Sequence, residues 1–104
     1  MIIQKPETPI KKIAENKELT SLTEQARGLA KAGEDKKAEE LYIEIIKKDP
    51  RNKNAYLELG QVYIKIGNSL DAEESFRQVL RLERGNNDAL RGIDEAIRLR
   101  EKKD

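Results

Sequence analysis

The stretch that decides the fold is residues 53–86, KNAYLELGQVYIKIGNSLDAEESFRQVLRLERGN, because its pattern occurs twice in the chain. Residues 19–52, LTSLTEQARGLAKAGEDKKAEELYIEIIKKDPRN, align with it without a gap at an offset of 34 residues. Seven aligned pairs are identical, and they are Glu24/Glu58, Lys31/Lys65, Gly33/Gly67, Ala38/Ala72, Glu39/Glu73, Glu40/Glu74 and Asn52/Asn86. A repeat of this period is typical of arrays built from one supersecondary unit.

Each copy predicts two helices. In the first copy, Leu22, Ala26 and Leu29 recur at the spacing of one helical face. Gly33 then ends the helix, because glycine adopts a left-handed conformation without strain. We expect Asp35 to cap the next helix. Its buried face is predicted to consist of Ala38, Tyr42, Ile45 and Ile46. The pair Asp49-Pro50 ends the helix, because the residue before a proline is disfavoured in the helical conformation.

A fifth helix follows the two copies, which we assign as repeat one (residues 19–52) and repeat two (residues 53–86). Residues 85–88, Gly-Asn-Asn-Asp, read as a turn with Asp88 as the helix cap. Residues 87–103 then predict a capping helix, apolar on one side and polar on the other, as the end of a helical stack requires.

Residues 1–18 do not fit the period, because Pro6 and Pro9 would fall inside a helix. We expect an N-terminal arm that is extended to about Thr8 and partly helical after it. Its apolar surface would come from Ile2, Ile3, Ile10 and Ile13.

Composition narrows the class of function. Charged residues make up 39% of the 104 residues, yet the net charge is only +1, so the basic excess of a nucleic-acid binder is absent. The chain has no cysteine and no histidine, which removes the commonest thiolate, general-base and metal-ligand chemistry. It also has neither the run of about 18 apolar residues that spans a membrane nor a signal-peptide pattern. We expect a cytoplasmic protein that is not an enzyme and needs no metal or cofactor.

The pattern resembles the tetratricopeptide repeat (TPR), a helix-turn-helix unit of 34 residues. The matching positions are Tyr56, Leu59, Gly60, Tyr63, Gly67, Ala72 and Phe76 in the second copy, and Leu22, Ala26, Leu29, Gly33, Ala38, Tyr42 and Pro50 in the first. The copies depart from the family at Gln25, where an apolar residue is usual, and at Arg84, which replaces a proline. The resemblance covers residues 19–97. It implies an all-α, right-handed helix-turn-helix solenoid of five helices, the last of them a C-terminal capping helix.

The resemblance also implies that the first helix of each pair lines a concave surface that binds peptides or partner domains. The partner-binding residues expected on it are Arg27, Lys31, Leu57, Gln61, Ile64, Lys65, Arg91 and Arg98. Gly92 is expected on the same surface. The function expected from the resemblance is therefore that of a protein-interaction scaffold or adaptor.

The clearest feature of this predicted groove is an apolar patch formed by Leu57 and Ile64, seven residues apart. The patch either anchors an apolar side chain of a bound segment, with the cations selecting acidic residues, or is covered by the chain's own arm, its fifth helix or a second copy. The alternative function is accordingly a self-assembly module, a homo-oligomer in which the arm or a second copy fills the groove.

One subgroup of the family binds the C-terminal carboxylate of chaperone tails through a clamp of lysine, asparagine and arginine. The equivalent positions here are Thr23, Arg27, Glu58, Asp88 and Gly92. None of them matches the clamp, and two are acidic. The sequence therefore argues against a chaperone tail as the partner.

Two carboxylate pairs, residues 39–40 and 73–74, suggest metal binding or acid–base chemistry. They repeat with the period of the array, however, and Arg77 lies four residues after Glu73, as in a surface ion pair. We interpret both pairs as part of a solvated outer face. Residues 85–88 lack the ligand spacing of a calcium or phosphate loop, so they are interpreted as a turn.

Overall fold

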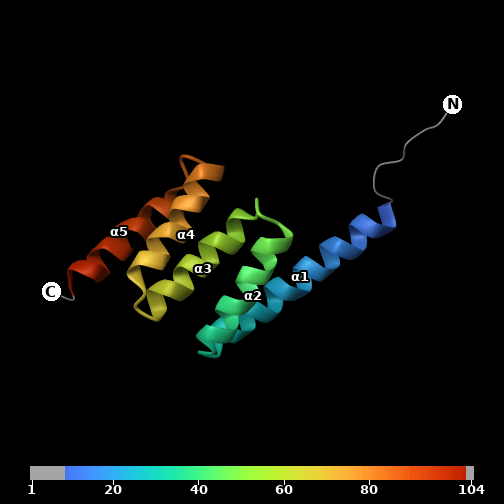
Figure 1. The fold of residues 1–104 in the computed structure, drawn as a ribbon, viewed down its shortest axis with the longest axis horizontal. Coiled ribbons are helices and arrows are strands. Elements are labelled where there is room, and N and C mark those ends of the chain that lie inside the picture. Colours follow the sequence, from blue (N-terminus) through green and yellow to red (C-terminus); the bar gives the residue numbers. More distant parts are fainter. Residues whose placement is uncertain (1–8, 103–104) are drawn as a thin grey trace.

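The computed structural model describes the backbone of residues 9–102 and the side chains of residues 16–102. Its elements are α1 (Pro9–Lys31), α2 (Asp35–Lys48), α3 (Lys53–Lys65), α4 (Ser69–Leu82) and α5 (Asn87–Glu101). Successive helices run antiparallel and stack side by side, from α1 at one end to α5 at the other (Figure 1). No strand occurs in this part of the chain. The expected all-α stack of five helices is confirmed.

The two glycine turns close the first helix of each repeat as expected. Gly33 and Gly67 have φ angles of 82° and 81°. The residue after each glycine donates its backbone N–H back to the helix, from Glu34 to the Leu29 carbonyl and from Asn68 to the Tyr63 carbonyl, both at 2.8 Å. This is the Schellman closure, in which the left-handed residue is usually glycine.

Asparagine caps three of the helices, and two predicted caps were wrong. The side chains of Asn52, Asn68 and Asn86 accept backbone N–H bonds at the starts of α3, α4 and α5. Asp88 is therefore not the cap of α5; it lies inside the first turn, two residues after Asn86. Asp35 is the first residue of α2, and the N-cap position before it is Glu34, whose side chain makes no capping hydrogen bond.

The N-terminal segment joins the first repeat without a break. α1 begins at Pro9 and continues to Lys31, so residues 9–18, assigned to the arm, form the first turns of one long helix. These turns project past α2 in Figure 1. Residues 1–8 lie outside the described part, as do the side chains of Ile10 and Ile13. Whether this segment acts as an arm stays a prediction.

The core depends on close approach of α4 to the helices on either side of it. Phe76 of α4 is 2% exposed. A Cβ atom placed on Gly60 of α3 or on Gly92 of α5 would lie 2.6 Å from its ring, far inside van der Waals contact. The expectation that Gly92 lies in the groove was therefore wrong: its backbone is packed against Phe76.

Two of the four glutamates assigned to a solvated face form hydrogen bonds between helices. The Tyr63 hydroxyl of α3 donates to Glu39 of α2 at 2.7 Å, and Arg100 of α5 donates to Glu73 of α4 at 2.9 Å. Both carboxylates are half-buried, whereas Glu40 and the second member of the other pair, Glu74, are exposed. The solvated-face interpretation therefore holds for one glutamate of each pair only.

We predict that Gly60→Ala or Gly92→Ala lowers the free energy of unfolding by about 1–2 kcal/mol. The added methyl overpacks a ring held from both sides, and this outweighs the gain of up to about 1 kcal/mol that alanine brings to a helix. Urea unfolding followed by circular dichroism measures the change. Gly28→Ala is the matched control, because its Cβ meets nothing within 4 Å. It should raise stability; equal effects at all three positions would contradict the prediction.

Candidate functional site

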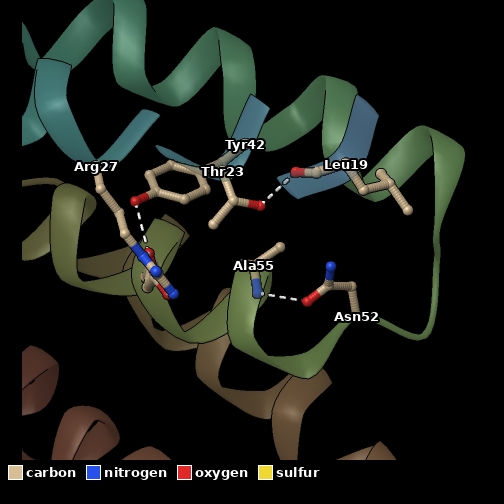
Figure 2. A network of polar contacts seen from close by, with 7 residues as sticks. Leu19, Thr23, Arg27, Tyr42, Asn52 and Ala55 are labelled. Carbon is tan, nitrogen blue, oxygen red and sulfur yellow. Dashed lines mark hydrogen bonds and ion pairs between the residues drawn. The ribbon is translucent and has the colours of Figure 1, made fainter. Parts of the chain in front are cut away.

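The centre of the predicted groove holds an ion pair between α1 and α3. Arg27 donates to both oxygens of Glu58, with Nε–Oε1 at 2.8 Å and Nη2–Oε2 at 2.7 Å. The Tyr42 hydroxyl of α2 donates to the same carboxylate at 2.8 Å. Figure 2 shows the Arg27 side chain reaching across beside the Tyr42 ring. Three consecutive helices therefore meet at one carboxylate, and the cation expected to meet a ligand is already paired.

Glu58 stays ionised in this setting. Its burial favours the neutral acid, but the hydrogen bonds from Arg27 and Tyr42 outweigh that cost, so the pKa of Glu58 lies below the ordinary carboxyl value. Burial, reinforced by the neighbouring Glu58 carboxylate, raises the pKa of Tyr42 above that of a free phenol. The hydroxyl therefore acts as a hydrogen-bond donor at neutral pH.

The second repeat replaces this arrangement as a unit. The positions offset by 34 residues from Arg27, Tyr42 and Glu58 are Gln61, Phe76 and Gly92. Where the aromatic residue has a hydroxyl, the next helix supplies a carboxylate. Where it has none, the next helix supplies a glycine that makes room for the ring. The polar arrangement is therefore a feature of the first repeat and not a requirement of the fold.

The other predicted cations do not form a ring of free charges. Lys65 donates to the Ala30 carbonyl at 2.6 Å and lies 2.9 Å from Asp35 Oδ1. Arg91 pairs with an aspartate at 2.9 Å, as does Arg98 at 3.1 Å, the partners being Asp88 and Asp94. Lys31 is exposed and has no ion pair within the described residues. The two arginine pairs are exposed, and exposed ion pairs contribute little to stability.

The predicted apolar patch is only partly available. Leu57 and Ile64 are both half-buried and pack against the core, while Gln61 between them is exposed. Ile64 also lines a hollow of about 510 Å³ between α3 and α5, and Leu57 does not. The remaining lining residues come from α5 and the residue after it: Arg91, Asp94, Glu95, Arg98, Leu99 and Lys102. Ile64 thus lies in one hollow with Arg91 and Arg98, and Leu57 is not among the residues that line it.

A second hollow, of about 350 Å³, lies at the α1 end of the groove. Its lining residues are Asn16, Leu19, Thr20, Thr23, Glu24, Arg27 and Asn52. The sequence did not predict this hollow, because Asn16 lay in the segment assigned to the arm and Leu19 at the first position of repeat one. Its polar groups are partly satisfied within the chain, since Thr23 donates to the Leu19 carbonyl at 2.8 Å (Figure 2). The sequence did contain one signal for this hollow, because Asn52, which lines it, is identical to Asn86 at the equivalent position of the second repeat.

No group of three or more histidine, cysteine or acidic side chains suited to a metal occurs within residues 16–102. Over the same described stretch, no helix is both long and apolar enough to cross a membrane.

Comparisons with known proteins identify the class. The family model described as Tetratricopeptide repeat matches residues 29–96. Among solved structures, the chain is similar to the second TPR of Spaghetti (RPAP3) bound to the HSP90 peptide SRMEEVD, with a TM-score of 0.67 and 23% identity over 85% of this chain and 93% of that one. No curated protein matches the sequence.

The chain belongs to the tetratricopeptide repeat family. Its fold is the right-handed helix-turn-helix solenoid of that family, which is the architecture of a protein–protein interaction module.

The low pKa of Glu58 predicts a pH dependence of stability. A carboxyl group whose pKa is depressed by folding stabilises the native state above its unfolded pKa, and this contribution is lost as the pH falls through the folded value. Between about pH 5 and pH 2, the range around and below the ordinary carboxyl pKa, the free energy of unfolding should fall less in Glu58→Gln than in the unsubstituted chain. Urea unfolding at a series of pH values measures it. Glu40→Gln, at an exposed position, is the control; parallel pH profiles for all three proteins would count against the prediction.

Proposed function

We propose that the chain captures an extended or helical segment of a partner protein on the surface formed by α1, α3 and α5. The observation that supports this most directly is the hollow between α3 and α5, where two half-buried aliphatic side chains, Ile64 and Leu99, lie among charged groups. Recognition of peptides commonly combines an apolar anchor with charged contacts at its edge. That the module acts in the cytoplasm remains a prediction.

The charges around this hollow favour an acidic segment. Arg91, Arg98 and Lys102 outnumber the two acids that line it, Asp94 and Glu95. The side chains of Arg91 and Arg98 are 78% and 73% exposed despite their ion pairs. Each guanidinium can therefore exchange its aspartate for a ligand carboxylate at little cost, because exposed ion pairs are worth at most about 1 kcal/mol. Arg27 is less available, since its carboxylate partner is also held by a tyrosine hydroxyl.

The structural neighbour supports the class of ligand, because the peptide bound to it, SRMEEVD, contains two glutamates and an aspartate. The mode of binding should differ from a carboxylate clamp. Of the clamp positions, Thr23 donates to a backbone carbonyl, Arg27 is paired with Glu58, and Gly92 is buried under Phe76. An internal acidic stretch flanking an apolar residue fits the hollow better than a C-terminal carboxylate does.

Selection of short random peptides displayed on phage tests the proposal. The selected peptides should carry one aliphatic or aromatic residue flanked by acids. Replacing both arginines, Arg91→Glu with Arg98→Glu, should weaken their binding about tenfold or more, because two charge-assisted contacts become repulsive. Fluorescence anisotropy measures the Kd.

The matched control is Lys47→Glu with Arg51→Glu, which changes the net charge by the same amount at two exposed positions of α2 and the turn after it. It should leave the Kd nearly unchanged. An equal loss in the control variant, or a selection that yields no binder, would refute capture in this hollow.

Light scattering addresses self-assembly: a dimer that becomes a peptide-binding monomer on removal of residues 1–8 would establish the alternative, in which the arm or a second copy fills the groove.

The peptide SRMEEVD should bind poorly. Because the clamp positions are paired, buried or acidic, we expect a Kd weaker than about 1 mM, equivalent to less than about 4 kcal/mol of binding free energy. Isothermal titration calorimetry measures it, with a phage-selected peptide as the positive control. A micromolar Kd for SRMEEVD would show that a carboxylate clamp forms by another route.

A further inference from the structure

The exposed face of α4 carries a concentration of arginine that the groove does not use. A hollow of about 440 Å³ is lined by Arg77, Leu80, Arg81 and Arg84, the last from the turn after α4. No acidic side chain lines it. In a chain whose net charge is +1, three arginines around one hollow form a marked local excess.

These arginines are largely unneutralised within the described part of the chain. The side chains of Arg81 and Arg84 form no ion pair or hydrogen bond there, and both residues are exposed. Arg77 donates to Glu73 at 3.0 and 2.7 Å, but Glu73 also accepts from Arg100 at 2.9 Å. Arg77 can therefore turn towards a ligand while Glu73 keeps a cationic partner.

The acids nearest in sequence are engaged elsewhere. Glu83 pairs with Lys53 of α3 and accepts from the Asn86 side chain at 2.9 Å. Glu74 accepts from Gln78 at 2.8 Å. Neither lines the hollow, so the field at its centre is set by the guanidinium groups.

The fold does not require this composition. The positions of repeat one that correspond to the four lining residues are Ile43, Ile46, Lys47 and Pro50. Only one of them is charged, and that repeat forms the same helix and the same turn. The arginines are thus an addition to the structural pattern of the repeat.

We infer that this hollow is a second docking surface, which binds an acidic segment of a partner protein. Guanidinium groups pair with carboxylates through two parallel hydrogen bonds, which favours arginine over lysine at such a surface. Leu80, half-buried at its base, offers apolar contact to the stem of a bound glutamate. A protein segment fits better than a nucleic acid, because the charge of the whole chain is nearly balanced and the basic surface comprises only three arginines.

This surface shares no residue with the hollow between α3 and α5. The module would therefore hold two segments at once, one with an apolar anchor in the groove and one rich in carboxylates on α4. Such a pair of sites is what an adaptor between two proteins needs.

A fluorescein-labelled oligoglutamate peptide is the probe, measured by fluorescence anisotropy at low salt. The variant Arg81→Glu with Arg84→Glu should weaken its binding about tenfold or more, since two cationic contacts are reversed. The control Lys47→Glu with Arg51→Glu carries the same change of charge near the corresponding turn of repeat one. It should retain the Kd of the unsubstituted chain within about threefold, the effect of long-range charge alone. Circular dichroism checks that both variants keep their helical content.

Binding that falls equally in both variants, or in neither, would overturn the proposal. So would an oligonucleotide that binds the same surface as tightly as the peptide does. The groove variant Arg91→Glu with Arg98→Glu separates the two sites: the docking surface on α4 requires that this variant retain oligoglutamate binding, whatever becomes of phage-selected peptides. Amide shifts in the NMR spectrum should change at residues 77–85 on addition of the probe, and shifts confined to α3 and α5 would contradict the assignment.

Discussion

The stack depends on how closely an aromatic ring on the second helix of a repeat approaches the backbone of its neighbours. Phe76 fills the space between α3 and α5 only because Gly60 and Gly92 present no Cβ atom. In the first repeat the equivalent ring, that of Tyr42, is as deeply buried. Here the next helix supplies Glu58 in place of a glycine, and the extra hydroxyl finds a hydrogen-bond acceptor. In the second repeat, a glycine makes room for the aromatic ring. In the first repeat, Glu58 accepts a hydrogen bond from the ring's hydroxyl, which avoids a buried, unsatisfied polar group.

The hydrogen bond between Tyr42 and Glu58 affects the charges in the groove. The Glu58 carboxylate that accepts from the tyrosine lies between α1 and α3, where Arg27 of α1 forms an ion pair with it. At the boundary between α1 and α3, these charged groups are therefore paired with one another within the chain. In the second half, Gly92 leaves no such carboxylate, and a hollow lined by Ile64 and α5 remains. The two copies of the repeat thus differ together in their core packing and in the charged groups at the groove.

The sequence predicted the fold well because the signals that specify it are local and repeated. Glycine stops, apolar stripes and the 34-residue register give the helices and their partners, and the positive φ angles of Gly33 and Gly67 follow directly. The site was harder to predict, because ion pairs depend on side-chain geometry that spacing does not contain. The eight predicted groove residues included Arg27, whose carboxylate partner lies 31 residues away on another helix. The wrong cap of α5 has a simpler origin: aspartate and asparagine cap helices about equally well, so the identity Asn52/Asn86 was the better guide there. The predicted cap of α2 was wrong by one residue, since its N-cap position is Glu34.

The register also explains why α5 differs from the first helices that precede it. The position where α4 approaches α3 most closely is Gly60, and its equivalents are Ala26 in α1 and Asp94 in α5. Asp94 is exposed and pairs with Arg98 at 3.1 Å, and neighbouring Leu90 is 49% exposed. The same carboxylate lines the hollow between α3 and α5. One position of the repeat therefore permits close helix packing in α1 and α3, where it is alanine or glycine, and contributes an acid to the edge of the hollow in α5.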